Sequence, residues 1–167
     1  MTIDTLFGTE EVTSKPRTIK FKTIKAVYET LVVREDITNY LKTGTRYTSP
    51  SQVSDTFQFL MKETKEMFIT LHLDGKNRII AMDVVSIGSL NQSIVHPRSV
   101  FMTACLTSAA AIILVHNHPT GDPSPSSEDI SITRRLREAG EIMGISILDH
   151  IIIGNGEYLS FSERGLL

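Results

Sequence analysis

Two imidazoles, a hydroxyl and a carboxylate lie within the stretch from His116 to Asp129, around a turn rich in proline. Side chains two residues apart on an extended chain share a face, so His116 and His118 can point at the same atom. Three prolines and a glycine keep residues 119–125 out of a helix, and Ser126 with Asp129 forms an S-x-x-D helix start. We therefore expect Asp129 in the first turn of a helix, facing back toward the histidines.

This set of side chains predicts a metal site. Imidazole nitrogen and carboxylate oxygen are common zinc donors, and a catalytic zinc site usually takes three protein ligands and leaves a fourth position to water. His116, His118 and Asp129 make up that count. The two histidines alone could also be the polar end of a strand, and it is the proline-rich turn with Ser126 and Asp129 that favours zinc.

The pattern H-N-H-P-x-G-x-x-x-P-S-x-x-D, which begins at His116, resembles the signature of the JAMM metalloproteases, also called MPN-plus or JAB, in their RadC-like branch. Residues 66–74, 95–98, 148–154 and 158–161 resemble RadC-family segments as well, so the resemblance spans roughly residues 49–167. It implies a JAB/MPN (cytidine-deaminase-like) fold and a zinc-dependent hydrolase of peptide or isopeptide bonds. The implied partner is a protein or peptide-like amide substrate.

Such a hydrolase needs a group that takes a proton from water and passes it to the leaving amine, and a glutamate is the usual candidate. Glu63 and Glu66 both lie where the first expected helix gives way to a strand. In the family the glutamate lies on an E-x-x-x-x-L type segment that leads into a strand, and the register of Glu66 fits better. Glu63 is the alternative, and either could be a solvated carboxylate at a helix end.

Ser126 has two candidate roles. Its oxygen can cap the helix, and its hydroxyl can donate to a developing oxyanion, which is the role that the family implies. The sequence does not separate the two. Asp149 and His150 form a further pair, but adjacent strand residues point to opposite faces, so we expect a hydrogen-bonded core role or support of a metal ligand. His72 and His96 receive no functional assignment.

The elements around these residues predict an α/β fold, a mixed sheet flanked by helices. Val53, Phe57 and Leu60 recur at helical spacing in a helix that starts at Ser49-Pro50 and ends between residues 62 and 65. Asp74-Gly75 indicates a hairpin turn. The expected strands are residues 68–73, 79–85, 111–115, 145–153 and 158–161. A second helix is expected to start at Pro97. A third is expected over residues 127–143, with Ile130, Thr133, Leu136 and Ile142 facing inward.

Composition and charge limit the partners and the cellular location that we expect for the protein. The formal charge of -2 and a pI near 6.2 give no cationic field over the whole protein of the kind that drives nucleic-acid binding. The single cysteine, Cys105, cannot form an internal disulfide and is expected to be a small buried residue. We find no apolar stretch near the length of a membrane span and no charged-then-apolar secretion signal. We therefore expect a cytoplasmic protein.

We expect two regions, an N-terminal extension over residues 1–48, partly extended with a mobile tail, and a RadC-like JAB/MPN domain over residues 49–167. Two basic clusters support an alternative function, a DNA-associated accessory protein of the RadC branch that uses the fold for binding. Alternating lysines can also protect a strand edge, and the helix-borne arginines suit a solvated face. Residues 1–48 also lack the paired short helices with a G-x-G hairpin that RadC-like proteins commonly add for DNA binding. The clusters are Lys15, Arg17, Lys20, Lys22 and Lys25, and Arg134, Arg135 and Arg137.

Overall fold

The computed structural model describes residues 25, 27–29, 43–88 and 95–167. The chain divides into two units, Met1–Leu31 and Val32–Leu167, and every helix and strand that the structure describes belongs to the second. In chain order these elements are α1 (Pro50–Phe57), the 3-10 helix η2 (Gln58–Lys62), β1 (Met67–Leu73), β2 (Ile79–Ile87), α2 (Pro97–Leu106), β3 (Ala111–Asn117), α3 (Ser127–Met143), β4 (Ser146–Ile153) and β5 (Tyr158–Ser160).

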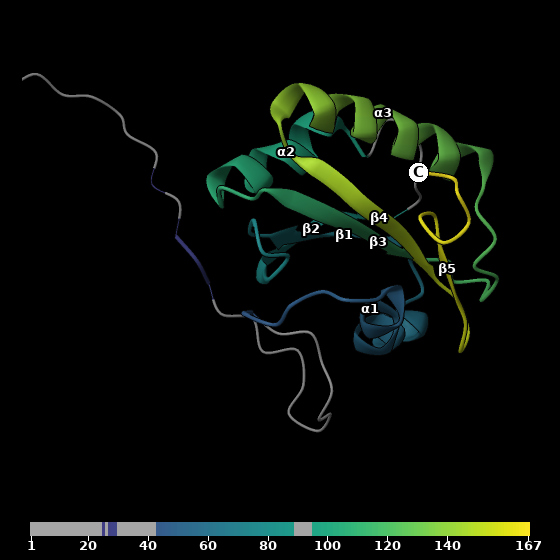
Figure 1. The fold of residues 1–167 in the computed structure, drawn as a ribbon. Coiled ribbons are helices and arrows are strands. Elements are labelled where there is room, and N and C mark those ends of the chain that lie inside the picture. The colour runs from purple at the N-terminus through teal and green to yellow at the C-terminus, as the bar shows by residue number, and fades with distance from the viewer. Residues whose placement is uncertain (1–24, 26, 30–42, 89–94) are drawn as a thin grey trace, which may run out of the picture. The chain divides into compact units, whose positions relative to one another are not determined.

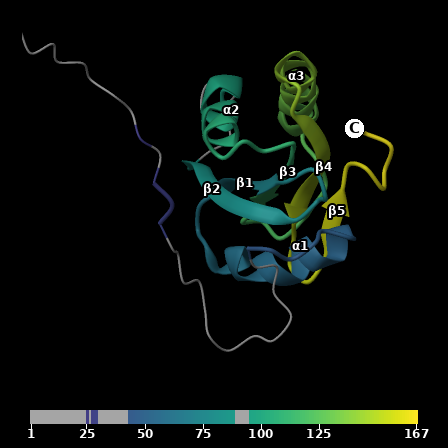
Figure 2. The same cartoon turned by 60° about the vertical axis from the view of Figure 1, so that its left-hand side comes forward.

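The strands form one mixed sheet in the order β2-β1-β3-β4-β5. The pair β3 and β4 is parallel, and the other neighbours are antiparallel. Parallel neighbours need a crossover, and α3 provides it. Helices α2 and α3 lie on one face of the sheet and α1 lies on the other (Figure 1; Figure 2). The predicted α/β fold with a mixed sheet between helices is confirmed.

Strand β3 is the centre of the sheet, and all seven of its residues are buried. Its side chains alternate between two hydrophobic clusters. Ile112 and Leu114 pack with α2 and α3, whereas Ile113 and Val115 pack with α1. Because alternate residues of a strand share a face, His116 lies on the α3 side of the sheet and Asn117 lies on the α1 side.

Local sequence signals account for the ends of the elements. Helix α1 begins at Pro50 and continues as η2 to Lys62, within the predicted range. The Asp74-Gly75 turn joins β1 to β2, and the Asp74 carboxylate accepts hydrogen bonds from the backbone N–H groups of Lys76 and Arg78. Helix α3 spans the predicted residues and ends at Gly144, whose φ of 69° suits glycine.

Two predictions about burial were wrong. Cys105 is exposed, because it follows the buried Ala104 by one residue, a rotation of about 100° that carries it off the inward face of α2. Ile142 is 87% exposed. The inward stripe of α3 runs through Ile132, Leu136 and Gly140, and Ile142 lies about 200° around the helix from Gly140.

Most of the expected N-terminal extension lies outside the described residues, including all of the lysine-rich cluster except Lys25. Its last residues are described and pair with the start of β2. Ile79 donates to the carbonyl of Thr45 and accepts from Gly44, and Arg46 forms a bridge with Arg78. Among the described residues, no helix combines the length and the apolar character needed to cross a membrane.

Candidate metal centre

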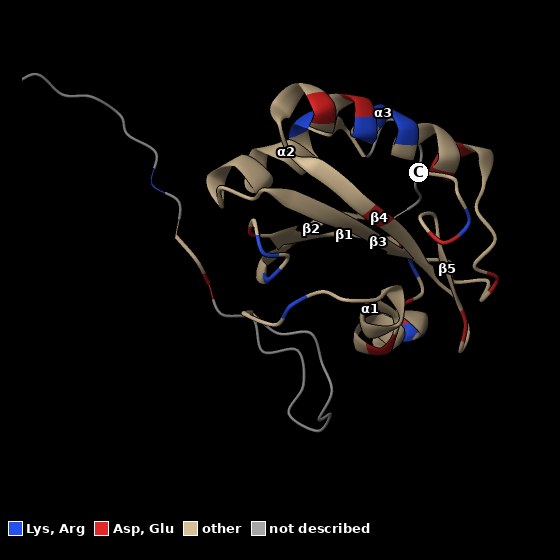
Figure 3. Ribbon diagram, in the orientation of Figure 1, with Lys and Arg blue, Asp and Glu red and all other residues tan. Residues whose placement is uncertain are grey.

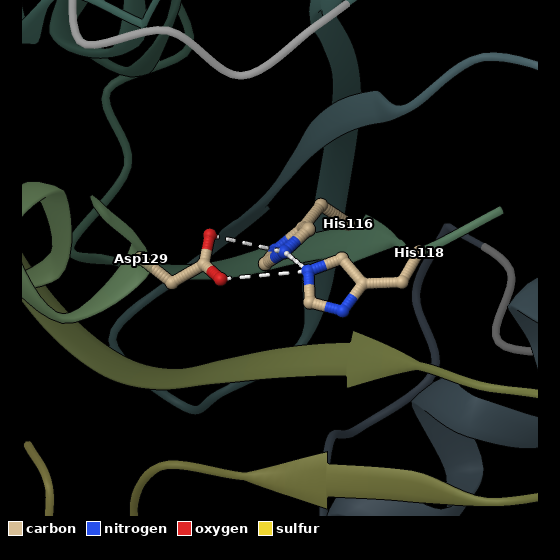
Figure 4. Close-up of side chains that lie close together, drawn as sticks. All are labelled: His116, His118 and Asp129. Atoms are coloured by element: carbon tan, nitrogen blue, oxygen red, sulfur yellow. Dashed lines mark hydrogen bonds and ion pairs between the residues drawn. The ribbon is translucent and has the colours of Figure 1, made fainter. Parts of the chain in front are cut away.

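The two histidines of the H-x-H pair lie at the C-terminal end of β3. His116 is fully buried between Phe68 of β1 and Ile152 of β4, its register partners, and His118 follows directly after the strand. Asp129 lies in the first turn of α3 and is also buried. In Figure 4 both imidazoles turn toward the Asp129 carboxylate, as the sequence predicts.

The donor atoms of these three side chains converge. The Nε2 atoms of His116 and His118 are 3.0 Å apart, His116 Nε2 lies 3.2 Å from Asp129 Oδ1, and His118 Nε2 lies 3.4 Å from Asp129 Oδ2. Zinc bonds of roughly 2.0–2.1 Å in a tetrahedron place neighbouring ligand atoms about 3.3 Å apart. The donor set therefore has the spacing of a zinc site, and in the described part of the chain no other such cluster of three side chains could hold a metal.

The turn that follows His118 holds its other ring nitrogen. His118 Nδ1–H donates to the backbone carbonyl of Asp122, 2.8 Å away, so the neutral ring has its lone pair on Nε2, toward the centre. Gly121, with a φ of 87°, makes this turn tight, and a Cβ there would lie 3.1 Å from the Cβ of Asn155. The proline-rich segment thus fixes the tautomer of one candidate ligand.

A capping box holds the third candidate ligand. The backbone N–H and the hydroxyl of Ser126 both donate to Asp129 Oδ2, at 2.8 and 2.7 Å, and the N–H of Asp129 donates back to Ser126 Oγ at 3.1 Å. Ser126 therefore has the capping role that the sequence offered for it. Its second role, donation to a substrate oxyanion, stays a prediction.

Burial and mutual contacts shift the pKa values of the three candidate ligands. Burial would raise the pKa of Asp129, but the contacts with His116 and His118 and the hydrogen bonds from Ser126 outweigh burial and hold the pKa well below its usual range. Burial lowers the pKa of His116, against the opposing effect of Asp129. The hydrogen bond with Asp129 raises the pKa of His118. The carboxylate is therefore anionic, as a metal ligand must be.

Glu66 lies beside the centre. Phe68 of β1 lies opposite His116, where the pairing of β1 with β3 ends, and Glu66 directly precedes β1, two residues before Phe68. The charge of Glu66 acts to raise the pKa of both His116 and His118, although burial leaves the pKa of His116 lowered. Glu63 instead ends η2, where its N–H donates to the carbonyl of Leu60.

Asn117, which the sequence reasoning missed, holds the backbone on both sides of Glu66. Its Oδ1 accepts from the N–H of Met67 at 2.9 Å, and its Nδ2 donates to the carbonyls of Leu60 and Lys65 at 3.1 and 3.3 Å. The signal available in the sequence was an amide at a strand position whose neighbours on that face, Ile113 and Val115, are apolar.

The Asp149-His150 pair divides between the two faces, as the sequence predicts. His150 is fully buried on the α3 side, with Nε2 2.8 Å from His116 Nδ1 and Nδ1 2.6 Å from the hydroxyl of Thr133. Asp149 accepts from the hydroxyl of Ser160 and the N–H of Ser162, and so holds the C-terminal segment. The other unassigned histidines have structural partners: His72 contacts the hydroxyls of Thr70 and Thr107, and His96 caps α2.

The chain resembles known proteins over most of its length. Residues 47–166 match the family model described as the RadC-like JAB domain. A UPF0758 protein of Pelobacter propionicus is 69% identical over 123 residues, which cover 73% of this chain and 54% of that protein. A UPF0758 protein of Geobacter sulfurreducens is 56% identical over 151 residues, which cover 90% of this chain and 66% of that protein. The chain spans about half the length of the first of these relatives.

Proposed function

Because this chain belongs to the RadC-like JAB domain family, we propose that it is a zinc-dependent hydrolase of peptide or isopeptide bonds. The observation that carries the proposal is the convergence of three metal donors at the end of β3, with Glu66 directly before β1 and near enough for its charge to act on both histidines. A metal site alone would serve a structural purpose equally well. A carboxylate beside it, outside the donor set, is what hydrolysis requires.

In this proposal His116, His118 and Asp129 hold the zinc ion. Bound there, zinc supplies a Lewis acid that lowers the pKa of a coordinated water to about 7. His118 is the most accessible of the three side chains, at 14% exposure against 0% for His116 and 3% for Asp129. The substrate carbonyl therefore approaches from the His118 side.

Glu66 is the proposed general base and general acid. Its carboxylate takes a proton from the attacking water and delivers it to the nitrogen of the leaving amine, so that the C–N bond breaks and a neutral amine departs. The fold supports this role because Glu66 directly precedes β1, whose pairing with β3 brings Phe68 opposite His116. Glu63 has no comparable support, since its backbone closes η2.

Ser126 is the proposed donor to the developing oxyanion. Its hydroxyl lies at the N-terminus of α3, where backbone N–H groups also point outward. To serve the substrate, the hydroxyl must turn from Asp129 Oδ2 toward the carbonyl oxygen. The backbone N–H of Ser126 continues to hold Asp129 when it does so.

Zinc-loaded protein should be screened against peptides and lysine-linked isopeptides that carry a fluorogenic leaving group. We expect wild type and Glu63→Gln to hydrolyse the same substrates, and we expect the rate of Glu66→Gln to be about 10²- to 10⁴-fold lower. Metal analysis of the same samples should show that Glu66→Gln keeps its zinc. Equal rates for Glu66→Gln and wild type would refute the assignment of Glu66.

A further inference from the structure

Four buried groups connect the ligand on β3 with the ligand on α3. His116 Nδ1 lies 2.8 Å from His150 Nε2, His150 Nδ1 lies 2.6 Å from the Thr133 hydroxyl, and that hydroxyl donates to the backbone carbonyl of Asp129. The exposed fraction of each residue is 2% or less. We call this set the Thr133–His150 network.

The direction of each hydrogen bond in the network follows from the final acceptor, the backbone carbonyl of Asp129. A carbonyl oxygen can only accept, so the single hydroxyl proton of Thr133 is committed to the carbonyl of Asp129. The oxygen of Thr133 must then accept from His150, which places the proton of the His150 ring on Nδ1.

The same reasoning carries on to His116. His150 is fully buried, with its ring stacked on Phe161 at 4.7 Å and edge-on to Phe68 at 5.6 Å, and a buried imidazole without a carboxylate partner is neutral. With its proton on Nδ1, its Nε2 can only accept, so His116 donates from Nδ1. The neutral His116 ring then carries a lone pair on Nε2, the atom that faces His118 and Asp129.

We propose that Thr133 and His150 are positioning residues of the metal centre, which keep the proton of His116 on Nδ1 and so present its Nε2 lone pair to the metal. The network does for His116 what the carbonyl of Asp122 does for His118. It also joins β3, β4 and α3 behind the site, so the two ligands keep their spacing. This inference rests on the proposed zinc site.

Thr133→Val tests the network because valine has nearly the shape of threonine without its hydroxyl. The zinc affinity, measured by competition with a chromogenic chelator, should fall about 10- to 100-fold. Thr133→Ser restores the hydroxyl and should restore most of the affinity. Thr70→Val is the matched control, since Thr70 is also fully buried and bonds to a buried histidine, His72, at 3.1 Å. Its zinc affinity should equal that of wild type.

The tautomer can be read directly in the zinc-free wild-type protein, which needs no variant to fold. Long-range ¹H–¹⁵N spectra of the histidine rings should show the His116 proton on Nδ1. A proton on Nε2 would overturn the inference, as would equal zinc affinities for Thr133→Val and Thr70→Val. Both outcomes leave the proposed hydrolase standing. A wild-type protein that binds no zinc would overturn the proposed function together with the inference.

Discussion

Each candidate ligand is held by a further hydrogen bond with a group outside the donor set. The carbonyl of Asp122 holds His118, the capping box of Ser126 holds Asp129, and His150 holds His116. Partners of this kind fix the tautomers and orientations of metal ligands and raise metal affinity. Contacts within the protein therefore orient these three side chains.

The two roles of Ser126 can be separated by two substitutions. Alanine at a helix N-cap costs about 0.5–2 kcal/mol of stability, whereas glycine costs only a few tenths. We expect Ser126→Ala to lower the free energy of unfolding and Ser126→Gly to leave it nearly unchanged. The rate of hydrolysis should fall about 10²- to 10³-fold in both variants, because both lack the hydroxyl. Full activity in Ser126→Gly would leave Ser126 as a cap alone.

The buried histidines make the zinc-free protein sensitive to acid. Burial lowers the pKa of His116 and of His150 below the ordinary histidine value. Below about pH 6.5 the unfolded chain takes up protons that the folded protein excludes, so stability that is present above this pH is lost as pH falls. The raised pKa of His118 adds no slope there, since His118 is protonated in both states.

Urea unfolding of zinc-free protein at several pH values measures this dependence. The free energy of unfolding should decline as pH falls below about 6.5, by up to about 1.4 kcal/mol per pH unit for each buried histidine. His150→Gln removes one of these groups and should reduce the slope by that amount. Identical slopes for the two proteins would mean that His150 titrates normally in the fold.

At the scale of the elements, the side chains of β3 alternate between the two faces of the sheet, and each face has a different role. His116 and His118 point to the α3 side and form the candidate metal centre, while Asn117 points to the α1 side and bonds the backbone at Lys65 and Met67. Asn117 thus ties the end of η2 and the start of β1 to the strand that carries the histidines. The position of Glu66 relative to the centre depends on this connection.

Asn117→Ala should release Glu66 from its position beside the candidate metal centre. The change removes a hydrogen bond from the buried carbonyl of Leu60 and from the part-buried backbone groups of Lys65 and Met67, and we expect the free energy of unfolding to fall by about 1–3 kcal/mol. Hydrolysis should fall because Glu66 is no longer held, whereas zinc binding should persist. Loss of zinc as complete as in His118→Ala would contradict this division of roles.

On the scale of the whole molecule, the net charge gives no cationic field that would attract nucleic acid. The formal charge is -2, and residues of both signs alternate along α3 (Figure 3). Arg137 pairs with Glu141 on this helix, with 3.5 Å between their charged groups. This pattern is typical of a solvated helix face.

Binding to DNA therefore stays a separate prediction, carried by the lysine-rich segment that lies mostly outside the described residues. Duplex binding through this segment would weaken steeply with salt and disappear on charge reversal at Lys20 and Lys22. It would not require His116 or His118. Measurement of duplex affinity across a salt series, with and without the charge reversal, decides the question. Binding that depended on the histidines would contradict it.

The sequence predicts those parts of the site that depend on neighbours along the chain. His116 and His118 share a face because they are two apart on a strand, and the capping box brings Asp129 to the N-terminus of α3. Thr133 and His150 meet His116 only because α3 crosses over to bring β4 beside β3. The pairing of β3 with β4 is a property of the fold, and no local sequence pattern predicts it.

The errors at Cys105 and Ile142 have a related cause. An apolar pattern shows that a helix has a buried face, but the width of that face depends on what packs against it. Helix α2 buries Val100, Phe101 and Ala104 and leaves the next residue exposed. The end of α3 leaves Ile142 in solvent. The helices themselves were predicted correctly, because proline, capping residues and glycine act within a turn or two of the chain.

The zinc content of the purified protein tests the central claim most directly. Wild-type protein, incubated with zinc and passed through gel filtration, should hold about one zinc ion per chain, as a site with three protein ligands does. Glu66→Gln should hold the same amount, and His118→Ala should hold none. A folded wild-type protein that retained no zinc, and took up neither cobalt nor manganese, would contradict the assignment of His116, His118 and Asp129 as a metal centre.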